Sequence, residues 1–145
     1  MDLVHGILLN YYFLTFVSAW SLSILFKALW HSWKDKKRFH IVDGMQNGGM
    51  PSSHTAVVSA LTFSLFFRTG LSDLFYIAAI FSAIIMSDAL KVRQNVGLQG
   101  EKLNELLKKF DEKTIKVVYG HSLFQVMAGM LLGFLCALIF RLILF

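Results

Sequence analysis

The chain has 145 residues and a formal net charge of +5, and 56% of its residues are apolar, 14% aromatic and 16% charged. This composition is too apolar for an ordinary water-soluble domain of this size, and the many Leu, Ile and Phe residues exclude a disordered chain. The single cysteine, Cys136, lies in an apolar run, which excludes disulfide frameworks and cysteine-rich zinc sites and predicts a small buried side chain.

Four apolar stretches have the roughly 17 to 25 residues that a helix needs to cross about 30 Å of hydrocarbon. They are residues 7–30, 50–67, 74–90 and 122–144. The first lacks a basic start and a small-residue cleavage pattern, so we expect a retained span and not a secretory signal. Pro51 is expected in the first turn of the second helix. The fourth contains Gly129 and Gly133, a spacing that allows close helix approach but is common by chance.

The basic residues are concentrated between these stretches. Eleven of the 14 Lys and Arg residues lie in the segments 34–38 and 91–116, which four crossings place on one side of the membrane. The positive-inside rule puts both segments in the cytoplasm and both termini outside. Topology and attraction to anionic lipids then explain the net charge, and nucleic-acid binding is disfavoured because no aromatic residues interleave the basic ones.

The second basic segment also has a helical pattern. Its apolar positions recur at helical spacing between charged residues: Leu103, Leu106, Leu107, Phe110, Thr114, Val117 and Val118. This pattern predicts an amphipathic helix on the cytoplasmic interface or, equally well, one packed against the bundle. The expected fold is therefore all-α: an integral membrane helical bundle with about four transmembrane helices and one cytoplasmic amphipathic helix, in a single domain over residues 1–145. Such short helices make a thin wall, so a homodimer is a reasonable expectation.

Ionisable residues at membrane depth are costly and are functional candidates by default, although those at helix ends can extend to the interface. Five stand at the cytoplasmic ends of the predicted spans: Lys27, His54, Asp88, Arg93 and His121. A single cytoplasm-facing site built by all four helices explains this arrangement more simply than five separate structural roles.

The densest signal is the sequence GGMPSSHT at 48–55. Gly48 and Gly49 permit a tight turn, and Ser52 and Ser53 place hydroxyl and N–H groups at a helix N-terminus, where anions are favoured. This predicts a phosphate-binding loop with the His54 imidazole beside it. The alternative is an ordinary loop with a helix cap.

A second cluster is GHS at 120–122, followed by Gln125. His121 and Gln125 are four residues apart and share a helix face, so the amide can accept a hydrogen bond from one ring nitrogen while the other faces a substrate. A helix cap with a neighbouring amide is the alternative here, and Asp88 with Arg93 can be a structural ion pair.

In this order along the chain, these blocks resemble the divergent branch of the type 2 phosphatidic acid phosphatase superfamily, the membrane relatives of acid phosphatases and vanadium haloperoxidases. The resemblance covers most of the chain, and GGMPSSH at 48–54 is its most specific part. The other matching parts are Lys27, the stretch 88–99, GHS at 120–122, Gln125 and Gly129.

The resemblance implies phosphoryl transfer by two histidines. It implies that His121 attacks phosphorus to form a phosphohistidine, and that His54 acts as the general acid. It implies that Lys27, Arg93, Ser52 and the N–H groups around Ser52 and Ser53 bind the phosphate, with Ser53 in the place of the superfamily's glycine. Asp88 is expected to orient Lys27 or Arg93.

The chain departs from the superfamily pattern at three points. The orienting position four residues after the nucleophile, an aspartate in the superfamily, holds Gln125, which can fix a tautomer but cannot stabilise an imidazolium electrostatically. Arg93 lies 28 residues before His121 instead of six. The usual six spans are reduced to four.

We therefore expect a membrane lipid phosphatase that hydrolyses a phosphate monoester or diphosphate of a lipid at the cytoplasmic leaflet, with no metal or other cofactor. Phosphatidylglycerophosphate, which is made on that face, is a better candidate substrate than a polyprenyl or other prenyl phosphate recycled outside. The expected location is the bacterial cytoplasmic membrane, with membrane lipids as partners and no nucleic acid.

Three alternatives are left open. The first is a non-catalytic membrane protein that binds or transports lipid phosphates. The second is a structural membrane protein whose histidines act as helix caps. The third is a metal site formed by His54, His121 and Asp88, whose ligand types suit zinc but include no close-spaced pair.

Overall fold

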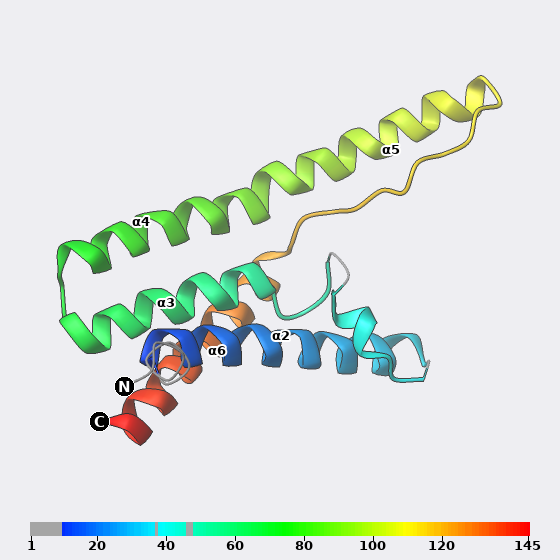
Figure 1. The fold of residues 1–145 in the computed structure, drawn as a ribbon. Helices are drawn as coiled ribbons and strands as arrows, with labels where there is room; N and C mark the ends of the chain where they lie inside the picture. Colours follow the sequence, from blue (N-terminus) through cyan, green and yellow to red (C-terminus); the bar gives the residue numbers. More distant parts are fainter. Residues whose placement is uncertain (1–9, 37, 46–47) are drawn as a thin grey trace.

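The computed structural model of the protein describes residues 10–36, 38–45 and 48–145, so the start of the first predicted span at 7–9 and the basic Lys37 lie outside the described residues. The described residues contain helices and no strand, which confirms the all-α class (Figure 1). The elements are α2 (Tyr11–Asp35), the 3₁₀ turn η1 (Ile41–Met45), α3 (Ser53–Thr69), α4 (Asp73–Ser87), the π-helical turn η2 (Asp88–Val92), α5 (Arg93–Lys109) and α6 (Leu123–Leu144).

Helices α2, α3, α4 and α6 form an up-and-down bundle at the four predicted stretches, and α3 packs against the other three (Figure 1). Within the described ranges, three helical stretches are long and apolar enough to cross a membrane: Tyr11–Asp35, the continuous Asp73–Lys109, and Leu123–Leu144. Helix α3 has 17 residues. The prediction of a membrane helical bundle is thus confirmed, with three such helices and α3 between them.

Helix α3 is more polar than its neighbours because protein, rather than lipid, surrounds it. Its buried residues are mostly small or hydroxyl-bearing: Thr55, Ala56, Val58, Ser59, Ala60, Thr62 and Ser64. The Thr62 and Ser82 hydroxyls lie 2.8 Å apart between α3 and α4, and Ser64 donates to the Ala60 carbonyl at 2.6 Å. Small residues and internally bonded hydroxyls let membrane helices approach closely.

The glycines of α6 lie at its contact with α3. A Cβ atom at Gly129 would collide with the Ser52 carbonyl oxygen, and one at Gly133 would collide with the Ala56 carbonyl oxygen. The GxxxG spacing therefore marks a real helix crossing, which sequence analysis weighted too lightly. Cys136, on the same helix, is buried as predicted.

Helix α5 continues the axis of α4 through η2 and leaves the bundle, and the chain then runs back along it (Figure 1). The amphipathic helix expected through Val118 ends at Lys109, so its predicted last turns at Thr114 to Val118 were wrong. Asp111 adopts a left-handed conformation with φ 59°, which terminates the helix. The Asn104 amide then exchanges two hydrogen bonds, of 2.9 and 2.8 Å, with the backbone of Ile115 and holds the returning segment extended.

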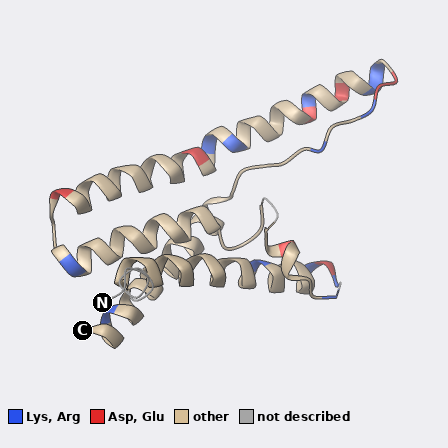
Figure 2. Cartoon of the chain, in the orientation of Figure 1, with Lys and Arg blue, Asp and Glu red and all other residues tan. Residues whose placement is uncertain are grey.

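Charged residues are distributed as a membrane bundle requires. They lie at the ends of the bundle helices and along α5 with its returning segment, while the walls of α2, α3, α4 and α6 are almost free of charge (Figure 2). Large apolar side chains on α4 face outward, among them Ile77, Ile80, Phe81 and Ile84. An apolar outer wall of this kind is what a lipid environment favours.

Candidate functional site

A pocket of about 510 Å³ lies at the end of the bundle where α3 and α6 begin and α4 ends. Six of the ten predicted site residues line it: Lys27, Gly48, Ser53, His54, Arg93 and His121. The other four, Gly49, Ser52, Asp88 and Gln125, are not among its lining residues. Residues separated by almost 100 positions in the sequence thus share one pocket.

The remaining lining residues were missed by sequence reasoning. They are Trp20, Ile24, Gly44, Met45, Val96, Val118 and Tyr119. A signal existed for two of them, because Trp20 and Ile24 precede Lys27 at helical spacing and so share its face of α2. No comparable signal existed for Val118 and Tyr119, since their position depends on the returning segment.

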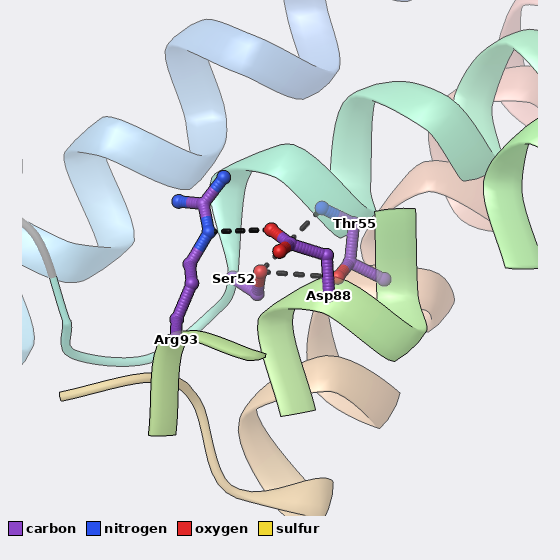
Figure 3. Close-up of polar contacts among 4 residues, drawn as sticks. All are labelled: Ser52, Thr55, Asp88 and Arg93. Atoms are coloured by element: carbon purple, nitrogen blue, oxygen red, sulfur yellow. Dashed lines mark hydrogen bonds and ion pairs between the residues drawn. The ribbon is translucent and has the colours of Figure 1, made fainter. Parts of the chain in front are cut away.

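At the start of α3, the two neighbouring serines have different surroundings. Ser52 is fully buried and is the N-cap, and its Oγ accepts from the Thr55 N–H at 3.4 Å and from the Thr55 hydroxyl at 3.0 Å (Figure 3). Ser53 lines the pocket, and its buried Oγ has no hydrogen-bond partner among the described residues. The hydroxyl available to a ligand is therefore that of Ser53. Pro51 precedes the cap, so its expected place in the first turn was wrong.

The loop before α3 packs directly on α2. Gly49 has φ +81°, and a Cβ atom there would lie 2.7 Å from His31 Nε2 and 2.9 Å from Lys27 Cγ. Both the backbone conformation and the lack of space require glycine at this position. Lys27 itself is only 5% exposed and stands two turns before the end of α2, deeper than the helix end predicted for it.

His121 precedes the N-cap of α6, and Gln125 fixes its ring. The Ser122 N–H donates to Gln125 Oε1 at 2.9 Å, which identifies this amide atom as the oxygen. His121 Nδ1 lies 3.2 Å from the same oxygen, and an oxygen can only accept, so Nδ1 carries the hydrogen. The neutral ring then has its lone pair on Nε2. Such a ring can act as a nucleophile or base in the pocket.

Burial lowers the pKa of His121 below its ordinary value of 6.5. The hydrogen bond to Gln125 acts in the opposite direction, and the nearby Lys27, His54 and Arg93 add to the lowering. The His121 imidazole is therefore neutral at pH 7, which is the state that holds a free lone pair.

Asp88 and Arg93 form an ion pair with 2.7 Å between the Asp88 carboxylate and Arg93 Nε (Figure 3). Of the two partners expected for Asp88, the structure pairs it with Arg93. The pair occupies the Nε–H, and the two terminal nitrogens carry the other four donors of the guanidinium. Arg93 can therefore hold the carboxylate and an anion together.

The lining residues combine two cations, two imidazoles and a serine hydroxyl, and they include no carboxylate. An ammonium and a guanidinium beside a helix N-terminus are the groups that bind phosphate oxygens. Among the described residues, no three His, Cys, Asp or Glu side chains gather as a metal site would require. The pocket is chemically suited to an anion with tetrahedral oxygens.

Comparison with known proteins places the chain in a family. The sequence model of a family described as "Divergent PAP2 family" matches residues 8–136, a range that contains every residue of the pocket. A Bacillus subtilis (strain 168) protein, named "Uncharacterized membrane protein YuiD", is 36% identical over 110 residues, covering 63% of this chain and 70% of that protein. No solved structure matches the chain.

Proposed function

The chain belongs to the divergent PAP2 family of membrane proteins, and we propose that it is a lipid phosphatase that hydrolyses a phosphate monoester or diphosphate of a lipid through a phosphohistidine intermediate. The observation that carries the proposal is the shared pocket of Lys27, Ser53, His54, Arg93 and His121. The working unit is one membrane-embedded domain over residues 1–145.

In the first step, the phosphate oxygens are held by the Lys27 ammonium, the Arg93 guanidinium and the Ser53 hydroxyl. Preorganised donors of this kind stabilise the negative charge of the transition state. The lone pair on His121 Nε2 attacks phosphorus, and the bond from phosphorus to the lipid oxygen breaks. His54 donates a proton to that oxygen, and this general-acid help is worth about 100- to 10,000-fold.

In the second step, water replaces the histidine. His54, now neutral, takes a proton from the water, whose oxygen attacks phosphorus while the phosphorus–nitrogen bond breaks. Inorganic phosphate leaves, and His121 regains its lone pair. Gln125 retains the Nδ1 hydrogen bond throughout and so keeps Nε2 directed at phosphorus.

Phosphatidylglycerophosphate is the substrate that we favour, because the basic segments 34–38 and 91–116 assign the pocket end of the bundle to the cytoplasm. Cysteines introduced singly at Lys34 or Arg38 test this assignment, since the native Cys136 is buried. We expect labelling by a membrane-impermeant maleimide only after the cells are opened. Labelling of intact cells would contradict the cytoplasmic assignment.

The proposal is tested with purified protein and a panel of lipid phosphates, by measuring released inorganic phosphate. We expect release by the wild type and by His40→Ala, a matched control because His40 is exposed and does not line the pocket. His121→Ala and His54→Ala should lose it. Equal release by all four proteins would overturn the roles of both histidines.

A second function is favoured by one observation, the neutral Gln125 at the position that orients His121. A neutral amide leaves the imidazolium of the phosphoenzyme without a counter-charge, which would suit a protein that binds or moves lipid phosphates without hydrolysing them. Saturable binding of a phosphate lipid without any phosphate release, weakened by Lys27→Ala, would support this function over the first.

A further inference from the structure

The turn η2 interrupts the long helix of α4 and α5 at the pocket. Its backbone is π-helical, with the Arg93 N–H bonded to the Asp88 carbonyl five residues earlier. Residues five apart lie about 140° from each other around an ordinary α-helix, too far for a direct ion pair. The wider turn brings the Asp88 and Arg93 side chains to the same side, where they meet at 2.7 Å.

The turn η2 also holds the backbone of the segment that carries His121. The His121 N–H donates to the carbonyl of Ala89, inside η2, at 3.0 Å. Ala89 is buried, so this bond is shielded from water. Because His121 lies before α6, helix geometry does not fix its backbone, and this hydrogen bond does.

Gly120 allows the segment that carries His121 to lie close to η2. A Cβ atom there would lie 2.5 Å from the Ala89 carbonyl oxygen, 2.7 Å from the Gln94 backbone nitrogen and 3.2 Å from the Arg93 carbonyl carbon. All three are backbone atoms of the helix, so none can move aside by changing a rotamer. Any side chain at this position would push the segment away from the turn.

We propose that the π-helical turn Asp88–Val92 is a positioning element that sets Arg93 through Asp88 and His121 through the Ala89 carbonyl, with Gly120 as the residue that permits the contact. The inference rests on the proposed function for its catalytic consequence. It assigns to Gly120 and to the Ala89 carbonyl a role in aligning the nucleophile with the phosphate ligand. π-helical turns inside α-helices occur frequently at functional sites.

The test compares Gly120→Ala with Gly100→Ala in the full chain, reconstituted in lipid nanodiscs. Gly100 is a matched control, because a Cβ atom there would meet only side-chain atoms of Val117, the nearest at 3.3 Å, and no backbone atom. A misplacement of about 1 Å can cost on the order of 100-fold in rate. We expect Gly120→Ala to lower kcat for phosphatidylglycerophosphate by about that factor with KM unchanged, and Gly100→Ala to keep both. Wild-type kcat in Gly120→Ala would overturn the inference.

A second measurement needs no variant and no turnover. Amide hydrogen exchange of the wild type should show the His121 N–H protected, although it lies in an extended segment. Exchange at the rate of an unstructured chain would overturn the inference, even if Gly120→Ala does not fold. If the wild type hydrolyses no lipid phosphate, the proposed function fails, and the protection of this amide still decides whether η2 holds His121.

Discussion

Helices α3 and α6 begin side by side, joined by a 3.0 Å hydrogen bond from the Ser52 N–H to the Gln125 carbonyl, and each begins with a serine cap. Their histidines are nevertheless held differently. His54 lies inside the first turn of α3, so the helix itself fixes its backbone. His121 lies before the cap of α6 and depends on bonds to Gln125 and Ala89. The two histidines should therefore respond to different mutations.

The largest expected effects distinguish the nucleophile His121 from the general acid His54. His121→Ala should abolish phosphate release from every substrate, because the nucleophile is gone. His54→Ala should lower release from a lipid phosphate by about 100- to 10,000-fold. With a nitrophenyl phosphate, whose leaving group needs no proton, it should release a first equivalent of nitrophenol at the normal rate and then stall, because His54 no longer activates water. Burst-phase and steady-state rates on both substrates measure this, and turnover of the nitrophenyl substrate by His121→Ala would contradict the assignment.

The next effect concerns only the α6 side. Gln125→Ala removes the acceptor of the His121 Nδ1 hydrogen and should lower kcat by about 100-fold through misalignment of the ring. Gln125→Glu keeps the acceptor and adds a charge that stabilises the imidazolium, so it should raise kcat about tenfold, which corresponds to roughly 1.4 kcal/mol. Unchanged kcat in both variants would show that Gln125 only caps α6.

On the α3 side, the two neighbouring serines are expected to have different roles. Ser52→Ala should lower the free energy of unfolding by about 1 kcal/mol, because it removes the helix cap. Ser53→Ala should leave stability almost unchanged and weaken the binding of inorganic phosphate, because Ser53 lines the pocket and its hydroxyl has no hydrogen-bond partner among the described residues. Denaturation and phosphate titration of the two variants measure this, and the reverse pattern would return the phosphate role to Ser52.

The smallest effect is on pH dependence. The pKa of His121 is lowered by burial, so its reactive neutral form is lost only when the pH falls below 6.5. The acidic limb of the kcat/KM profile should therefore lie below this value. The bond to Gln125 raises the pKa, so Gln125→Ala should move this limb to lower pH. A limb that does not move in Gln125→Ala would assign it to another group.

The bundle was predictable because long apolar stretches have few alternatives in a chain of this composition. The pocket residues at span ends were predictable for the same reason, since Lys27, His54, Arg93 and His121 stand where charge is costly. The family resemblance added their order along the chain. The match to residues 8–136 confirms the family, and the roles of these residues stay predictions.

What the sequence did not reveal depends on contacts between distant segments. The periodicity of residues 103–118 predicts a helix throughout. In the structure, the Asn104 side chain forms two hydrogen bonds with the backbone of Ile115, and the segment around Ile115 is extended. The π-helical turn has no local signature, because it exists through the contacts of Ala89 and Gly120. The sequence also does not specify which of Ser52 and Ser53 caps α3, because either serine of the pair can do so; in the structure it is Ser52.

The central claim is that His121 takes the phosphoryl group, while His54 donates a proton to the departing lipid oxygen and accepts one from the incoming water. The most direct test uses His54→Ala with nitrophenyl phosphate labelled by radioactive phosphorus. Its leaving group needs no proton and the activation of water is lost, so the intermediate should accumulate. The account predicts an acid-labile, base-stable label that maps to the peptide containing His121. Label on any other residue, or turnover of the wild type with no labelled protein in either form, would contradict it.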